Sequence, residues 1–137
     1  MASGELQVAS GKLKTASSKP HQRLDVWQQA MLLVKEVYSA TASFPAAEMF
    51  GLTSQMRRAA VSIPANIAEG AARTGDKEYL HFLSIARGSL SELDTHIQIA
   101  VMLGYLSADH KLHDMLDAVG KLLSGFCKKL HRDVTTK

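Results

Sequence analysis

The sequence predicts an all-α protein, and within that class an antiparallel up-down-up-down four-helix bundle. Apolar residues recur at steps of three and four along four separate segments, which is the period of a helix buried on one side. The composition is 46% hydrophobic but only 6% aromatic, which favours aliphatic helix packing over a β-sandwich. A chain of 137 residues has the length of one domain with one core.

The first helix is expected from about Leu24 to the Phe44-Pro45 pair, because a proline pushes the preceding residue away from α geometry. The second is expected from about Thr53 to residue 69 or 72. Pro64 lies inside it and cannot donate a backbone hydrogen bond, so we expect a bend between residues 60 and 64.

The third helix is predicted to be the longest, from Asp76 as its N-cap to about Leu103. Gly104 follows as a C-terminal cap, since glycine adopts left-handed backbone geometry at little cost. The fourth helix is expected to begin at Ser107 or Asp109 and to carry a wide apolar face to a basic end. Short connections between successive helices imply antiparallel neighbours.

Residues 1–23 are predicted to be a disordered basic tail, and residues 24–132 to form the bundle. The tail holds four basic side chains and one acidic one, so it carries the whole formal charge of +3 and the remainder is formally neutral. A tail of this composition has two interpretations: a solvated segment, or an electrostatic arm for phosphate.

The single cysteine, Cys127, excludes an intrachain disulfide, and no secretory signal or long apolar run is evident. We therefore expect a cytoplasmic protein with no membrane partner. A core or interface position is the expected role of Cys127, against the alternative of a reactive thiol lowered in pKa by the adjacent lysines.

Two patterns in the sequence are typical of enzyme or metal sites. Glu78 and His81 form one E-x-x-H step of the di-iron type, but no second copy exists, and a glutamate at a helix start favours the macrodipole. Acidic and histidine residues at 109–117 have the spacing of a surface metal site, but acidic residues in a first helical turn with histidines on a solvated face explain the same pattern without metal. We expect no enzyme activity, cofactor, metal or small-molecule substrate.

Polar residues interrupt the second and third helices. Buried charge needs a partner, so we expect a structural network between these helices or across a subunit boundary. Its candidate members are Arg58, Ser62, Asn66, Glu69 and Glu92. The alternative is a phosphate-binding role for Arg57 or Arg58.

Basic residues cluster near the C-terminus, where they complement the helix dipole or form a positive surface for a nucleic-acid backbone. Together with Arg57 and Arg58, the candidate nucleic-acid contacts are Lys121, Lys128, Lys129 and Arg132.

Several segments resemble one family, the bacterial four-helix-bundle proteins encoded in intervening sequences of 23S ribosomal RNA genes. The resemblance spans about residues 24–130. It rests on residues 24–27, on Phe44-Pro45 with Glu48, on the strings at 51–60 and 62–70, on 82–93 and on 104–106. The family is similar to the accessory variability protein of diversity-generating retroelements, which binds nucleic acid and contacts a reverse transcriptase.

The resemblance implies a bundle without known catalytic activity that assembles as a ring-shaped homo-oligomer, with a pentamer as the expected form. We interpret the chain as a non-catalytic oligomeric scaffold that associates with structured RNA or with a nucleic-acid enzyme such as a reverse transcriptase. The alternative is a protein-only interaction module that binds no nucleic acid.

Overall fold

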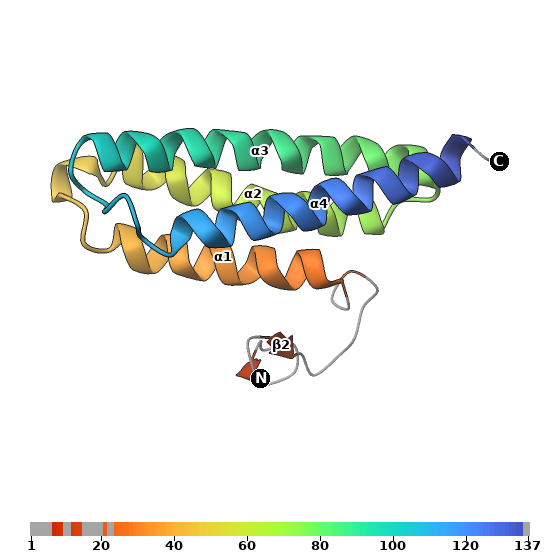
Figure 1. Ribbon diagram of the computed structural model, residues 1–137, viewed down its shortest axis with the longest axis horizontal. Coiled ribbons are helices and arrows are strands. Elements are labelled where there is room, and N and C mark those ends of the chain that lie inside the picture. Colours follow the sequence, from red (N-terminus) through yellow and green to blue (C-terminus); the bar gives the residue numbers. More distant parts are fainter. Residues whose placement is uncertain (1–6, 10–11, 15–20, 22–23, 136–137) are drawn as a thin grey trace.

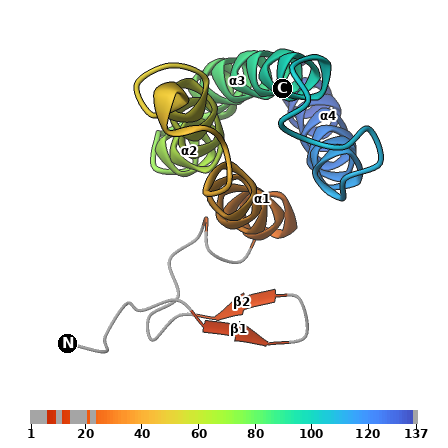
Figure 2. The ribbon, with the colours of Figure 1, turned by 90° about the vertical axis from the view of Figure 1, so that its left-hand side faces the viewer.

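Four helices lie side by side and form the body of the protein (Figure 1). The structure is a computed structural model that describes residues 7–9, 12–14, 21 and 24–135. The helices are α1 (Asp25–Thr41), α2 (Leu52–Ala71), α3 (Asp76–Met102) and α4 (Leu112–Thr135). The end-on view shows them in the order α1, α2, α3, α4 around the bundle (Figure 2). The predicted all-α four-helix bundle is confirmed.

The contacts between helices place α3 between α2 and α4. Between α2 and α3, the Ser62 hydroxyl forms a hydrogen bond with the Ser89 hydroxyl. Gly70, further along α2, packs against Tyr79 near the start of α3. Because the order of contacts is reversed, these two helices run in opposite directions. Aliphatic side chains fill the interior. Those with almost no exposed surface include Leu33, Met56, Ile63, Ile67, Leu83, Leu93, Ile97, Leu112 and Leu123.

The predicted N-cap of α3 is wrong, and its predicted C-terminal cap is confirmed. Gly75, with φ of 105°, occupies the N-cap position, so Asp76 is the first helical residue and not the cap. At the C-terminal end, Gly104 has φ of 80°, and the amide of Tyr105 donates to the carbonyl of Ala100 at 2.8 Å. This is the glycine-terminated cap that the sequence predicted.

Helix α4 begins at Leu112, later than the predicted start at Ser107 or Asp109. The Ser107 hydroxyl donates to the Asp109 carboxylate at 2.9 Å, and the Leu112 amide donates to Nδ1 of His110 at 3.0 Å. Local side-chain hydrogen bonds of this kind compete with helix formation, so these residues form the turn that precedes the helix.

Pro64 is buried inside α2, and the helix continues through it without a break. The bend expected between residues 60 and 64 stays a prediction. None of the helices in the described part of the chain has the length and apolar character that crossing a membrane requires.

Short elements accompany the helices in the described part of the chain. The 3-10 helix η2 (Ala46–Glu48) lies between α1 and α2, and strands β1 (Gln7–Ala9) and β2 (Lys12–Lys14) pair antiparallel. The sequence did not predict the strands. Most of the tail 1–23 falls outside the described residues, so its expected disorder stays a prediction.

Candidate nucleic-acid interface

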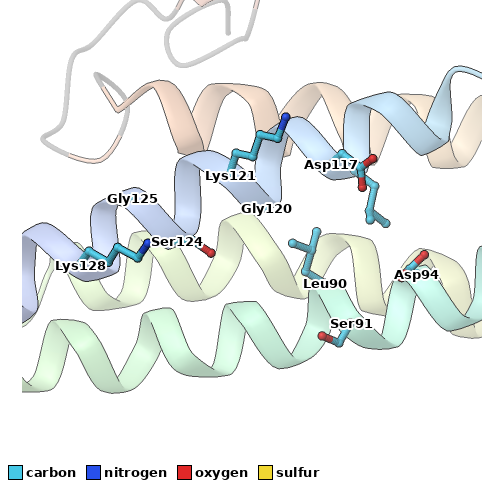
Figure 3. A pocket seen from close by; sticks show the side chains of 10 residues that line it. Leu90, Ser91, Asp94, Asp117, Gly120, Lys121, Ser124, Gly125 and Lys128 are labelled. Atoms are coloured by element: carbon cyan, nitrogen blue, oxygen red, sulfur yellow. The ribbon is translucent and has the colours of Figure 1, made fainter.

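A groove follows the surface between α3 and α4. Its first stretch is a hollow of about 550 Å³ (Figure 3), lined by Leu90, Ser91, Asp94, Leu116, Asp117, Gly120, Lys121, Ser124, Gly125 and Lys128. Its second stretch is a hollow of about 750 Å³, lined by Leu80, Ser84, Arg87, Ser124, Cys127, Lys128, His131 and Arg132. Ser124 and Lys128 line both hollows. The two are therefore continuous, and we call them the α3/α4 groove.

The charge of the groove changes along its length. The second stretch contains the basic residues Arg87, Lys128 and Arg132 together with His131, and no Asp or Glu is among the described residues that line it. The first stretch contains the carboxylates of Asp94 and Asp117, which Figure 3 shows at the end away from Lys128. An anion is therefore attracted to the second stretch and repelled from the far end of the first.

The basic side of α4 follows from its helical period. Lys121, Lys128 and Arg132 are exposed and separated by seven and four residues, so they lie on one side of the helix, about 10 Å and about 6 Å apart along its axis. The opposite side buries Leu112, Leu116, Val119, Leu123 and Leu130. Lys129 is exposed but does not line the groove. The structure thus brings together three of the four candidates near the C-terminus.

Arg87 of α3 joins this cluster, although no sequence pattern predicted it. Its guanidinium lies beside Cys127 of α4: burial raises the pKa of the Cys127 thiol, and Arg87 opposes part of that rise. A thiol with a raised pKa is mostly protonated at neutral pH, which suits a structural cysteine. The available signal was the helical period, which places Arg87 one turn from Ser84 and Ser91.

Arg57 and Arg58 lie on α2, outside the groove. The Arg57 Nε donates to the Thr41 hydroxyl at 2.9 Å, and its guanidinium lies 4.6 Å from the centre of the Tyr38 ring. These contacts fasten α2 to α1, which is a structural role. Arg58 is exposed on the outer surface.

Only part of the expected polar network forms within one chain. The Ser62 hydroxyl bonds the Ser89 hydroxyl at 2.8 Å, and the Asn66 amide donates to the Ser62 hydroxyl at 3.0 Å. Glu69 instead pairs with Arg73 at 2.7 Å, and Glu92 lies 3.7 Å from the buried His96. The hydrogen bond between α2 and α3 therefore joins two neutral side chains, and Ser89 was not among the predicted members of the network.

The enzyme and metal candidates do not assemble into a site in the part of the chain that the structure describes. Glu78 is an exposed residue in the first turn of α3, where its charge favours the helix dipole. Across the described residues, no three His, Cys, Asp or Glu side chains gather closely enough to hold a metal ion.

The family model described as 23S rRNA-intervening sequence protein matches residues 22–125, which includes α1, α2, α3 and more than half of α4. No curated protein matches the chain.

Proposed function

Because the chain belongs to the 23S rRNA-intervening sequence protein family, we propose that it is a non-catalytic scaffold that associates with structured RNA through the basic side of α4. One observation carries the proposal: exposed Lys121, Lys128 and Arg132 share one side of α4, and Lys128 and Arg132 line a groove stretch whose described lining contains no carboxylate. Cations arranged in this way bind a phosphate backbone by displacing its counterions.

The neutral charge of residues 24–137 does not argue against this function, because the charges are separated in space. The acidic residues of the groove, Asp94 and Asp117, lie in the stretch away from Arg132. A surface can therefore present a local positive potential on a chain that is neutral as a whole.

The proposal includes assembly into a homo-oligomer, with a pentameric ring as the expected form. Apolar side chains remain exposed on the helices of the single chain, among them Val61 of α2, Ile85 of α3 and Leu122 of α4. Such side chains give an assembly apolar surface to bury. A ring would also repeat the basic side of α4 and so strengthen binding to a long RNA through multivalency. Native mass spectrometry tests this part, and a monomer at working concentration contradicts it.

The RNA-binding part is tested by titrating a fluorescent structured RNA across a salt series. The comparison variant changes Lys128, Lys129 and Arg132 to Ala. We expect a steep salt dependence for the native protein that becomes shallower in the variant, by about 0.7 in the slope of log K against log salt for each phosphate contact removed from a single strand. A variant with unchanged affinity and slope contradicts the assignment of the RNA surface to α4.

A protein-only interaction module is the second candidate function. Phe50 is 96% exposed and Met102 is 77% exposed, and both lie in or beside the loops at the end of the bundle opposite the C-terminus. Exposed apolar side chains of this size suit a protein partner, including a nucleic-acid enzyme such as a reverse transcriptase. Native protein that binds no RNA at low salt favours this alternative.

A further inference from the structure

The cations of the second groove stretch stand on both of its walls. Arg87 projects from α3, while Lys128 and Arg132 project from α4. A flat basic surface can hold a duplex from one side only. Cations that face one another across a groove can instead contact a single polymer strand from both sides, which favours one strand lying between the two helices.

Small polar residues lie between these cations. Ser84 of α3 and Ser124 of α4 line the same stretch, and their hydroxyl groups are donors that phosphate and sugar oxygens accept. No Phe, Tyr or Trp is among the described residues that line either stretch. The groove therefore offers contacts to a backbone and lacks the aromatic platforms on which bases stack.

The carboxylates limit the length of the strand. Lys121 and Arg132 are separated by eleven residues of α4, or about 16 Å along the helix. Beyond Lys121, Asp94 and Asp117 line the groove from opposite helices and repel phosphate. Binding is thus confined to the half of the groove nearer the C-terminus.

We propose that the α3/α4 groove binds the sugar-phosphate backbone of a short single-stranded RNA segment without sequence preference, with Arg87 contacting it from the wall opposite Lys128. This inference rests on the proposed RNA association and deepens it. It places the bound RNA strand between α3 and α4, and it adds Arg87 to the residues that contact the strand.

The test uses Cys127, the one cysteine of the chain, which lines the same stretch as Arg87. Alkylation by the neutral reagent N-ethylmaleimide is timed for the full chain at mildly alkaline pH, with oligouridylate, with a blunt RNA duplex, or without RNA. We expect oligouridylate to slow the alkylation of Cys127, and the duplex to slow it much less. A variant with Cys127→Ser and Ser39→Cys moves the thiol to the exposed surface of α1, where RNA should give no protection.

Arg87→Gln tests the contact from α3, and Lys35→Gln is its control because it removes the same charge from an exposed site on α1 outside the groove. We expect Arg87→Gln to weaken oligouridylate binding about fivefold to tenfold and to reduce the salt slope by about 0.7. Lys35→Gln should leave the slope nearly unchanged. Circular dichroism of each variant establishes that the helices are intact.

The outcomes separate this inference from the function on which it rests. If no RNA binds the native protein at low salt, both are wrong. If RNA binds and the triple alanine variant of α4 weakens binding, but Arg87→Gln and Cys127 alkylation are unaffected, the groove is wrong and the proposed function stands. Equal protection of Cys127 by duplex and single strand overturns the preference for a single strand.

Discussion

Helix α3 packs against α2 on one side and against α4 on the other, and glycine residues at these two boundaries have different surroundings. At the α2/α3 boundary, a Cβ added to Gly70 would lie 2.8 Å from Cδ1 of Tyr79 and 3.0 Å from Cβ of Phe82. At the α3/α4 boundary, a Cβ on Gly125 would meet nothing within 4 Å. Gly70 therefore permits close packing of α2 on α3, whereas Gly125 borders the open α3/α4 groove.

The serines show the same contrast. Ser62 and Ser89 bond one another at 2.8 Å inside the α2/α3 boundary, whereas Ser84 and Ser124 line the open groove. A hydroxyl that is used between helices contributes to stability, while one that faces a groove is available to a ligand. The comparison suggests that one boundary serves the fold and the other serves binding.

Alanine substitutions at three glycines should change the free energy of unfolding in opposite directions at the two boundaries. Gly70→Ala should destabilise the protein by about 1–3 kcal/mol through overpacking against Tyr79 and Phe82. Gly125→Ala should stabilise it by about 0.5–1 kcal/mol, because alanine is the better helix residue and nothing crowds the added methyl group. Gly120→Ala, 3.3 Å from Cδ2 of Leu90, should fall between them. Urea unfolding measures all three.

Equal effects at Gly70 and Gly125 would contradict the contrast between the two boundaries. The m-value serves as a control in the same experiment. An unchanged m-value shows that the substitutions alter stability without changing how much surface unfolding exposes.

A double-mutant cycle on Ser62 and Ser89 measures how much their hydrogen bond stabilises the α2/α3 boundary. Each single change to Ala should cost about 1 kcal/mol, because it leaves the other hydroxyl without its cross-helix partner. The double variant should lose less than the sum of the two single losses. The same cycle on Ser84 and Ser124, which line the groove, should be additive. Additive behaviour of Ser62 and Ser89 would show that their contact does not stabilise the α2/α3 boundary.

Removing the two carboxylates at the other end of the groove should strengthen the proposed RNA binding. Asp94→Asn and Asp117→Asn together should tighten oligouridylate binding by a few fold at low salt, and the gain should shrink as salt rises. Asp114→Asn, an exposed change of the same charge on α4 outside both hollows, is the control. An equal gain in the control would mean that net charge, and not the groove, decides affinity.

The fold was predictable because its signals are local. The apolar period marked each helix, and Gly104 marked the end of α3 through its left-handed conformation. The start of α4 was wrong, since the hydrogen bond from the Leu112 amide to the His110 ring depends on side-chain geometry that no period reveals.

The candidate site was predictable only in part. Lys128 and Arg132 are close in the sequence, so their clustering on one helix could be inferred directly. Arg87 lies far from them in the chain, and it reaches the same groove only because α3 packs beside α4. Likewise, Arg57 had the residue type of a phosphate contact, but its bond to Thr41 and its position over the Tyr38 ring give it a structural role.

A dependence of stability on alkaline pH is expected at Tyr79, which lies against Gly70 of α2 and Phe126 of α4. Burial raises the pKa of Tyr79 to about 12, and its ring meets Phe126 edge-on with centroids 5.2 Å apart. An unfolded tyrosine ionises at a pKa of about 10. The unfolded chain therefore loses its phenolic proton first, so the stabilisation is complete below about pH 10 and is lost as the pH rises towards 12.

Tyr79→Phe isolates this dependence from the titration of other groups. The difference in unfolding free energy between the native protein and the variant should be constant at neutral pH and should change only between about pH 10 and 12, in the direction of lower native stability. Absorbance of the phenolate checks the assignment, because Tyr79 should ionise near pH 12 in the folded protein. A difference that stays constant through pH 12 would mean that the Tyr79 hydroxyl is as exposed to solvent in the folded protein as in the unfolded chain.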